Sequence, residues 1–368
     1  LSNASIATTG IAGPSGGTIK KPIGLVYIAI YLNGKTIAVI SLGWLGDTII
    51  NEMLCCNIKK LYPDSRLVLI VSKTFEDLGK IMTCDKCYSY DKSNEHKGVT
   101  GLFKLVKQIK KQEKIHTAIL THTHERTVLF AKLLSPKTIA SVYLKNHNPL
   151  NLFINKHYSM EAKEFFSTYR GNFNANMLRL LCNNYEIDYK TNIQIPHEED
   201  LKTTEKFKDI IPFEKDYIAI STTSKQEAND WDINEIVNFT SRCELPVVFI
   251  GTGRAHDIAQ KIKSYNLPNF IDITNKTTIM DTAVILSKAN CVISVDTGTM
   301  HMAYLLNKPT ICLFHQPIMI PQWYPAYLDN VKILVGHKYL DEKTKKIIKL
   351  KEIQSTDVLN LVNQLRSK

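Results

Sequence analysis

The chain has 368 residues, more than one ordinary hydrophobic core organises, so its length predicts two domains. Hydrophobic residues make up 44% of the chain and charged residues 22%, as is typical of a soluble globular protein, and no stretch approaches the roughly 20 apolar residues that a membrane-spanning helix requires. The formal net charge of +11 favours an acidic partner: nucleic acid, anionic lipid, or a phosphorylated or carboxylated substrate.

The amino-terminal segment predicts a leader followed by a hairpin. Residues 1–17 are small and rich in Gly, Ser and Thr, which indicates a disordered leader or a cloning remnant. The apolar run 25–32, the turn dipeptide Asn33-Gly34 and the apolar run 35–40 then form a hairpin signal, with a short interfacial segment as the alternative. We therefore assign residues 1–34 to a leader with a first hairpin strand.

Strands and helices alternate over the next part of the chain, which predicts a doubly wound sheet. The expected strands are 36–41, 66–71, 117–120 and 138–142, and the expected helices are 48–62, 101–114 and 126–134. The pattern loosens between residues 146 and 190, where helix 175–184 is the clearest element. Residues 35–190 are thus expected to form the first domain, followed by a charged, proline-bounded linker at 191–212.

The alternation restarts after the linker and predicts a second domain at residues 213–345. The expected strands are 217–220, 246–250, 270–273, 291–294 and 310–314, and the expected helices are 234–242, 256–265 and 278–288. A closing helix, 355–367 within the segment 346–368, is expected to pack back across the first domain.

Cysteine usage indicates a reducing compartment. The eight cysteines are scattered, and the lone C-x-x-C of Cys84 and Cys87 lacks the second ligand pair that a zinc site requires. Cys291 and Cys312 lie in apolar segments, where cysteine acts as a small hydrophobic residue. We expect all eight thiols to be reduced, as in the cytoplasm.

The turn after the strand 291–294 has the geometry of an anion site. It opens a helix, so its free backbone N–H groups point at whatever lies before the helix. Asp296, Thr297 and Gly298 stand where a phosphate or ribose would lie, and His301 follows one turn later. The segment therefore predicts a nucleotide site at the carboxyl edge of the second sheet.

Three segments carry a family resemblance. They are residues 40–47 (ISLGWLGD) with 62–66, residues 295–301 (VDTGTMH), and residues 221–225 (STTSK) with Trp231 downstream. They resemble, in this order, the amino-terminal signature, the nucleotide-site signature and the phosphate-binding loop of the ADP-heptose:lipopolysaccharide heptosyltransferases, glycosyltransferase family 9. The resemblance implies a GT-B fold, with two facing Rossmann-like domains, and an inverting, metal-independent transfer from ADP-heptose to an acidic inner-core acceptor, with no cofactor.

The resemblance assigns catalytic roles to two residues. Asp47 matches the family's catalytic aspartate, which takes the proton of the acceptor hydroxyl, although the spacing alone favours a helix N-cap. Lys225 is expected to stabilise the charge on departing ADP, although Glu227 and Asp230 separate it from Trp231, unlike the family pattern. An ordinary solvated lysine is the alternative.

The remaining candidates divide between donor and acceptor. The expected donor-binding residues are Thr222, Thr223, Lys225, Gly251, Asp257, Thr277, Asp296, Thr297, Gly298 and His301. The expected acceptor-binding residues are Gly46, Lys59, Lys60, His122 and Arg126. For Asp257 the alternative is a partner of the helix dipole, for His301 a buried histidine bonded to a carbonyl, and for the acceptor set solvated surface charge.

The sequence thus predicts a cytoplasmic glycosyltransferase that is peripheral at the cytoplasmic face of the inner membrane. Its partners would be a nucleotide sugar and an anionic lipid-linked oligosaccharide, and a positive surface would help dock the latter. The first alternative is a GT-B enzyme with another nucleotide sugar, such as a UDP-sugar. The second is a non-catalytic nucleotide-sugar or nucleic-acid binding protein, although no nucleic-acid motif is present, so we expect no nucleic-acid partner.

Overall fold

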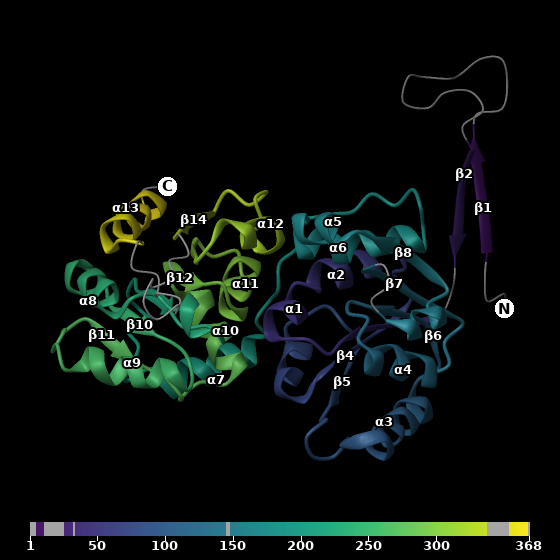
Figure 1. Cartoon of the computed structure of the whole chain (residues 1–368), viewed down its shortest axis with the longest axis horizontal. Coiled ribbons are helices and arrows are strands. Elements are labelled where there is room, and N and C mark those ends of the chain that lie inside the picture. The colour runs from purple at the N-terminus through teal and green to yellow at the C-terminus, as the bar shows by residue number, and fades with distance from the viewer. Residues whose placement is uncertain (1–4, 11–25, 32–33, 145–147, 337–352, 367–368) are drawn as a thin grey trace, which may run out of the picture.

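The computed structural model describes residues 5–10, 26–31, 34–144, 148–336 and 353–366. It contains two six-stranded sheets, which lie in two lobes side by side (Figure 1). Both sheets are wholly parallel, with helices packed on both faces, so the predicted α/β class with two doubly wound domains is confirmed.

The first domain has the strand order β5-β4-β3-β6-β7-β8. Its strands are β3 (Thr36–Ser41), β4 (Arg66–Ser72), β5 (Lys86–Tyr90), β6 (Ile115–Leu120), β7 (Thr138–Leu144) and β8 (Lys156–Met160). Its helical segments are α1 (Leu45–Ile49), α2 (Glu52–Leu61), η1 (Lys73–Lys80), α3 (Gly98–Gln112), α4 (Glu125–Leu133), η2 (Pro149–Phe153), α5 (Ala162–Ser167), α6 (Arg170–Asn176) and η3 (Met177–Leu180).

The second domain repeats this arrangement with the order β11-β10-β9-β12-β13-β14. Its strands are β9 (Ile218–Ser221), β10 (Val247–Phe249), β11 (Phe270–Asp272), β12 (Cys291–Val295), β13 (Thr310–Phe314) and β14 (Val331–Val335). Its helical segments are α7 (His197–Phe207), η4 (Glu227–Asn229), α8 (Ile233–Arg242), α9 (Arg254–Lys263), α10 (Ile279–Lys288), α11 (Gly298–Leu305), η5 (Pro317–Met319), α12 (Ile320–Trp323) and α13 (Ser355–Arg366).

The central strands are apolar because helices cover them on both faces. Every residue of β3, β9 and β12 is buried, and these are the strands at which the strand order reverses. None of the helices in the described part of the chain has the length and apolar content to cross a membrane.

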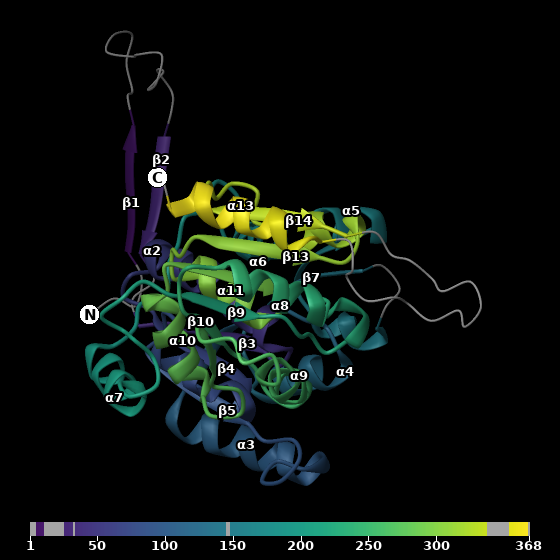
Figure 2. The same ribbon diagram turned by 90° about the vertical axis from the view of Figure 1, so that its left-hand side faces the viewer.

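Two sequence-based expectations were wrong. The run 25–32 does not form a hairpin with 35–40: β2 (Val26–Tyr31) pairs antiparallel with β1 (Ser5–Gly10), while β3 enters the parallel sheet because both its edges pair with β4 and β6. The β1–β2 ribbon projects from the first lobe (Figures 1 and 2). Of the expected leader, residues 1–4 and 11–17 lie outside the described residues.

The closing helix is the second correction. α13 packs against α8 and buries Val358 and Val362 in the core of the second domain, rather than crossing to the first. Figure 1 shows it in the same lobe as α8. The indole Nε1 of Trp231 donates a hydrogen bond to the Ile353 carbonyl at 2.8 Å, so the chain entering α13 is fixed to this domain.

The two domains meet mainly where α1 contacts α11. A Cβ on Gly46 would lie 2.6 Å from Cδ2 of His301, and one on Gly298 would lie 2.5 Å from Cγ of Leu45. The two glycines therefore allow a separation of α1 and α11 that no larger residue permits. A buried hydrogen bond of 2.7 Å between the hydroxyls of Tyr169 and Tyr304 also links the domains.

Candidate functional site

Polar loops follow the central strands of both sheets, at the junction of the two domains. In the first domain, α1 after β3 carries Asp47, and the loop after β6 carries His122. In the second, the loop after β9 carries Lys225, and the turn after β12 carries Asp296. Ligands of doubly wound sheets bind where the strand order reverses, and these four residues follow the strands that flank those points.

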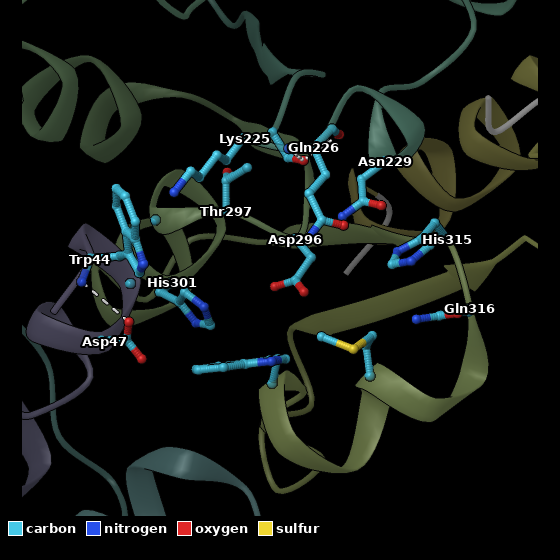
Figure 3. A pocket seen from close by; sticks show the side chains of 15 residues that line it. Trp44, Asp47, Lys225, Gln226, Asn229, Asp296, Thr297, His301, His315 and Gln316 are labelled. Carbon is cyan, nitrogen blue, oxygen red and sulfur yellow. Dashed lines mark hydrogen bonds between the residues drawn. The ribbon is translucent and has the colours of Figure 1, made fainter. Parts of the chain in front are cut away.

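A cavity of about 340 Å³ lies at this junction, and both domains line it (Figure 3). The first domain contributes Trp44, Gly46 and Asp47. The second contributes Ser224, Lys225, Gln226, Asn229, Asp296, Thr297, Gly298, His301, His315, Gln316, Met319 and Trp323. Two segments that the sequence predicts to be functional, around Asp47 and around Asp296, therefore share one space.

The Asp47 carboxylate is held by two neighbours in its own domain. The backbone N–H of Trp44 donates to Oδ2 at 3.2 Å, and His122 Nε2 lies 3.4 Å from Oδ1. Burial alone would raise the pKa of this carboxyl, but the His122 contact, the Trp44 N–H and the positive charge of Arg170 outweigh it and lower the pKa. Asp47 is therefore ionised at neutral pH, and it caps α1 while one face lines the cavity.

Asp296 has the opposite electrostatic character. Burial, and secondarily the charge of Asp47, raise its pKa to about 7. No cation forms an ion pair with Asp296 among the described residues, and Figure 3 shows Lys225 extending toward Trp44 instead. The site thus holds one ionised carboxylate and one carboxyl that is half protonated near neutral pH.

His301 is a neutral histidine that lies where the two domains meet. Burial lowers its pKa to about 4, although the charge of Asp47 opposes this shift. Its Nδ1 shares a 2.6 Å hydrogen bond with the hydroxyl of Tyr304, and that hydroxyl is hydrogen-bonded in turn to the hydroxyl of Tyr169. The imidazole is therefore fixed by both domains while it lines the cavity.

An ion pair between the half-buried Arg254 and the buried Asp230 anchors the loop that carries Lys225. Arg254 Nε lies 2.6 Å from Oδ2 of Asp230, which is fully buried, and Arg254 Nη2 donates to the Ser224 carbonyl at 2.6 Å. Asp230 Oδ1 also accepts from the Ser224 N–H at 2.9 Å. The Lys225 ammonium then lies 3.7 Å from the centroid of the Trp44 ring, a cation–π contact across the domain junction.

The structure brings only part of the predicted donor set to this cavity. Lys225, Asp296, Thr297, Gly298 and His301 line it. The other five predicted residues do not line the cavity: Thr222, Thr223, Gly251, Asp257 and Thr277. Of these, Thr222 is buried and Asp257 is exposed.

The predicted acceptor set is divided in the same way. Gly46 lines the cavity and His122 contacts Asp47. Lys59 instead pairs with Asp85 at 3.0 Å, and Lys60 pairs with Asp188. Arg126 is exposed near the start of α4 and does not line this cavity. The two lysines on α2 thus have structural partners away from the site.

Sequence reasoning missed several lining residues. His315 and Gln316 directly follow β13, so the edge rule that located Asp296 also predicts their position. Met319 and Trp323 lie on η5 and α12, for which the sequence carries no comparable signal.

Comparison with known proteins gives different relatives for the two ends of the chain. Residues 174–353 match the model of glycosyltransferase family 9 (heptosyltransferase), and residues 1–49 match that of the CinA C-terminal domain. Clostridial proteins described as competence-damage inducible are 71% identical over 34 residues in Clostridium botulinum and over 35 residues in Clostridioides difficile. The chain spans only 8% of the length of these curated relatives.

Solved structures of similar fold cover the body of the chain. A glycosyl transferase family 9 protein from Veillonella parvula superposes with a TM-score of 0.78 at 19% identity, covering 90% of this chain and 97% of that one. The Escherichia coli ADP-heptose lps heptosyltransferase II gives 0.73 at 14% identity, covering 90% and 98%. The E. coli heptosyltransferase WaaC, solved with ADP, gives 0.67 at 11% identity, covering 90% and 99%.

The fold is therefore that of the GT-B heptosyltransferases, as the resemblance implied. Together with the match of residues 174–353 to the model of glycosyltransferase family 9, it shows a glycosyltransferase of heptosyltransferase-like fold.

Proposed function

We propose that this glycosyltransferase transfers heptose from ADP-heptose to an anionic, lipid-linked inner-core oligosaccharide, with inversion and without a metal ion. The observation that carries the proposal is the shared cavity: Asp47 from the first domain and Asp296 to His301 from the second line one space. A solved structure of similar fold, the E. coli heptosyltransferase WaaC, contains ADP, which supports a nucleotide as a ligand of this fold.

The proposed reaction is a single displacement. Asp47 accepts the proton of the acceptor hydroxyl as its oxygen attacks the anomeric carbon of the heptose. The bond from that carbon to the diphosphate breaks as the new glycosidic bond forms, and ADP leaves with the electron pair. Attack opposite the leaving group inverts the configuration. A carboxylate that is ionised at neutral pH is ready for this step.

The second domain would stabilise the departing diphosphate. Backbone N–H groups at the start of α11 and the ammonium of Lys225 are available for the negative charge that develops on ADP. His301, being neutral, can donate or accept a hydrogen bond there without adding charge. The Asp296 carboxyl is better suited to a sugar hydroxyl, since an ionised carboxylate would repel the diphosphate.

The acceptor and the location complete the proposal. The net charge of +11 would favour an anionic acceptor at an anionic membrane surface, so we assign the enzyme to the cytoplasmic face of the inner membrane as a peripheral protein.

Calorimetry with ADP and UDP, followed by mass spectrometry of an acceptor panel with ADP-heptose, tests this function. ADP should bind about tenfold or more tightly than UDP, one lipid-linked acceptor should gain one heptose, and EDTA should leave turnover unchanged. Preference for UDP would instead indicate another nucleotide sugar, and salt-dependent oligonucleotide binding without transfer would indicate a binding protein.

The raised pKa of Asp296 predicts how ADP affinity depends on pH. Below pH 7 the carboxyl is protonated and neutral, whereas above pH 7 it is ionised and repels the diphosphate. The dissociation constant of ADP should therefore rise by up to about tenfold between pH 6 and pH 8 in the wild type, beyond any change in Asp296→Asn. The protonation of ADP itself is the same for the wild type and for Asp296→Asn at each pH, so it cancels when the two profiles are compared. Parallel profiles would contradict the assignment.

A further inference from the structure

A second cavity, of about 240 Å³, lies in the first domain next to Asp47. The loop at 121–124, the end of β7 at 142–144, and Phe165, Phe166 and Arg170 line it. His122 belongs to this lining and also lies 3.4 Å from Asp47, which lines the first cavity. The two cavities therefore meet at the Asp47–His122 pair.

Arg170 in this cavity is a buried charge with unused hydrogen-bonding capacity. Only 6% of the residue is exposed, yet its Nε and Nη1 have no hydrogen-bond partner among the described residues. A buried guanidinium that lacks partners is unfavourable, because it gives up water without gaining equivalent bonds. Its position in a cavity lining indicates that the missing partner is a ligand.

Aromatic packing holds this guanidinium in place. It lies 4.2 Å from the ring centroid of Phe165 and 4.6 Å from that of Phe173, so two cation–π contacts partly offset its burial. The negative charge of Asp47 stabilises the charged form of Arg170 electrostatically, but no ion pair joins Arg170 to any described residue. Arg170 is thus held in the same cavity lining as His122, the contact of Asp47, while its Nε and Nη1 donors remain available.

We propose that this cavity is the acceptor subsite and that Arg170 binds an oxyanion, a carboxylate or phosphate, on the acceptor sugar. The inference rests on the proposed function, because it assigns the cavity that His122 lines beside Asp47 to the sugar whose hydroxyl Asp47 deprotonates. Guanidinium N–H groups form strong charge-assisted bonds with both kinds of oxyanion. Recognition of the anion would place the neighbouring hydroxyl at Asp47.

The test is calorimetric titration of the full chain with three soluble probes. Glucuronate carries a carboxylate, glucose 6-phosphate carries a phosphate, and glucose is the neutral control. At least one anionic probe should bind in the millimolar range, about tenfold more tightly than glucose, and Arg170→Met should lose about tenfold or more of that affinity. The stronger of the two anionic probes identifies the group.

Arg179→Met is the matched control, because Arg179 is exposed on η3 and lines neither cavity. It should bind the probes as the wild type does, and ADP affinity should be unchanged in both variants. If Arg170→Met fails to fold, the wild type still gives an answer: the side-chain Nε–H resonance of Arg170, assigned by its loss in Arg170→Lys, should shift with the anionic probe.

Two results would overturn the subsite: no preference of the wild type for either anion over glucose, or equal anion binding by the wild type and a folded Arg170→Met. The second result, accompanied by a changed pH profile of transfer, would mean that Arg170 acts only on the ionisation of Asp47. These failures are distinct from failure of the proposed function, since ADP binding and heptose transfer are measured separately.

Discussion

Asp47→Asn is expected to lower sugar transfer by about 1,000-fold or more while ADP affinity stays within about twofold of the wild type. The amide has nearly the same shape as the carboxylate but cannot accept the proton of the acceptor hydroxyl. It retains an oxygen for the Trp44 N–H, which now donates to Oδ2 at 3.2 Å, so the start of α1 should be preserved. The loss should therefore appear in catalysis rather than in folding or in nucleotide binding.

Single-turnover transfer and ADP calorimetry measure the two halves of this prediction on the same protein. Asp64→Asn is the matched control, because Asp64 is exposed in the turn after α2 and lines neither of the two cavities at the domain junction. It should transfer at the wild-type rate. Turnover by Asp47→Asn close to that of Asp64→Asn would show that Asp47 is only the cap of α1, the role that sequence spacing alone favours.

Most of the fold followed from the sequence because parallel central strands must be apolar on both faces. That rule located the central strands, including β3, β9 and β12, and the edge at which their loops meet. The rule did not locate the edge strands β5, β8 and β14, because each of them pairs with only one neighbour and has partly exposed residues. The pairing of β2 with β1 could not be predicted either. A local turn signal after β2 favours pairing with the next strand, β3, and does not show that β1 pairs with β2 instead.

The site was predictable where a side chain follows a central strand, and not where contacts between distant segments decide its role. Asp47 and Asp296 belong to the first kind. Lys59 belongs to the second, since only the fold reveals that Asp85 pairs with it. Arg170 lies in a segment without a recognisable pattern, and its significance comes from Phe165 and Phe173, which enclose it, and from the partners that it lacks.

Gly298→Ala is expected to lower transfer by about 100-fold, because a misplacement of about 1 Å between reacting groups costs that much. The added Cβ would lie 2.5, 2.6 and 2.7 Å from Cγ, Cδ2 and Cβ of Leu45, so α1 and α11 must move apart. α1 carries Asp47 and α11 carries His301, so the shift separates the base from the donor. The alanine keeps the backbone N–H, and ADP affinity should change by no more than about threefold.

Leu45, the residue that the added methyl group would meet, provides the control. Leu45→Gly removes all three atoms that the new methyl group would meet, and alone it should lower transfer only slightly, since Leu45 touches no reacting group in the proposed mechanism. In the double variant the two helices can approach again, so transfer should recover by about tenfold over Gly298→Ala. Independent, multiplicative losses in the double variant, or normal transfer by Gly298→Ala, would show that the separation of α1 and α11 does not set the distance between Asp47 and the bound donor.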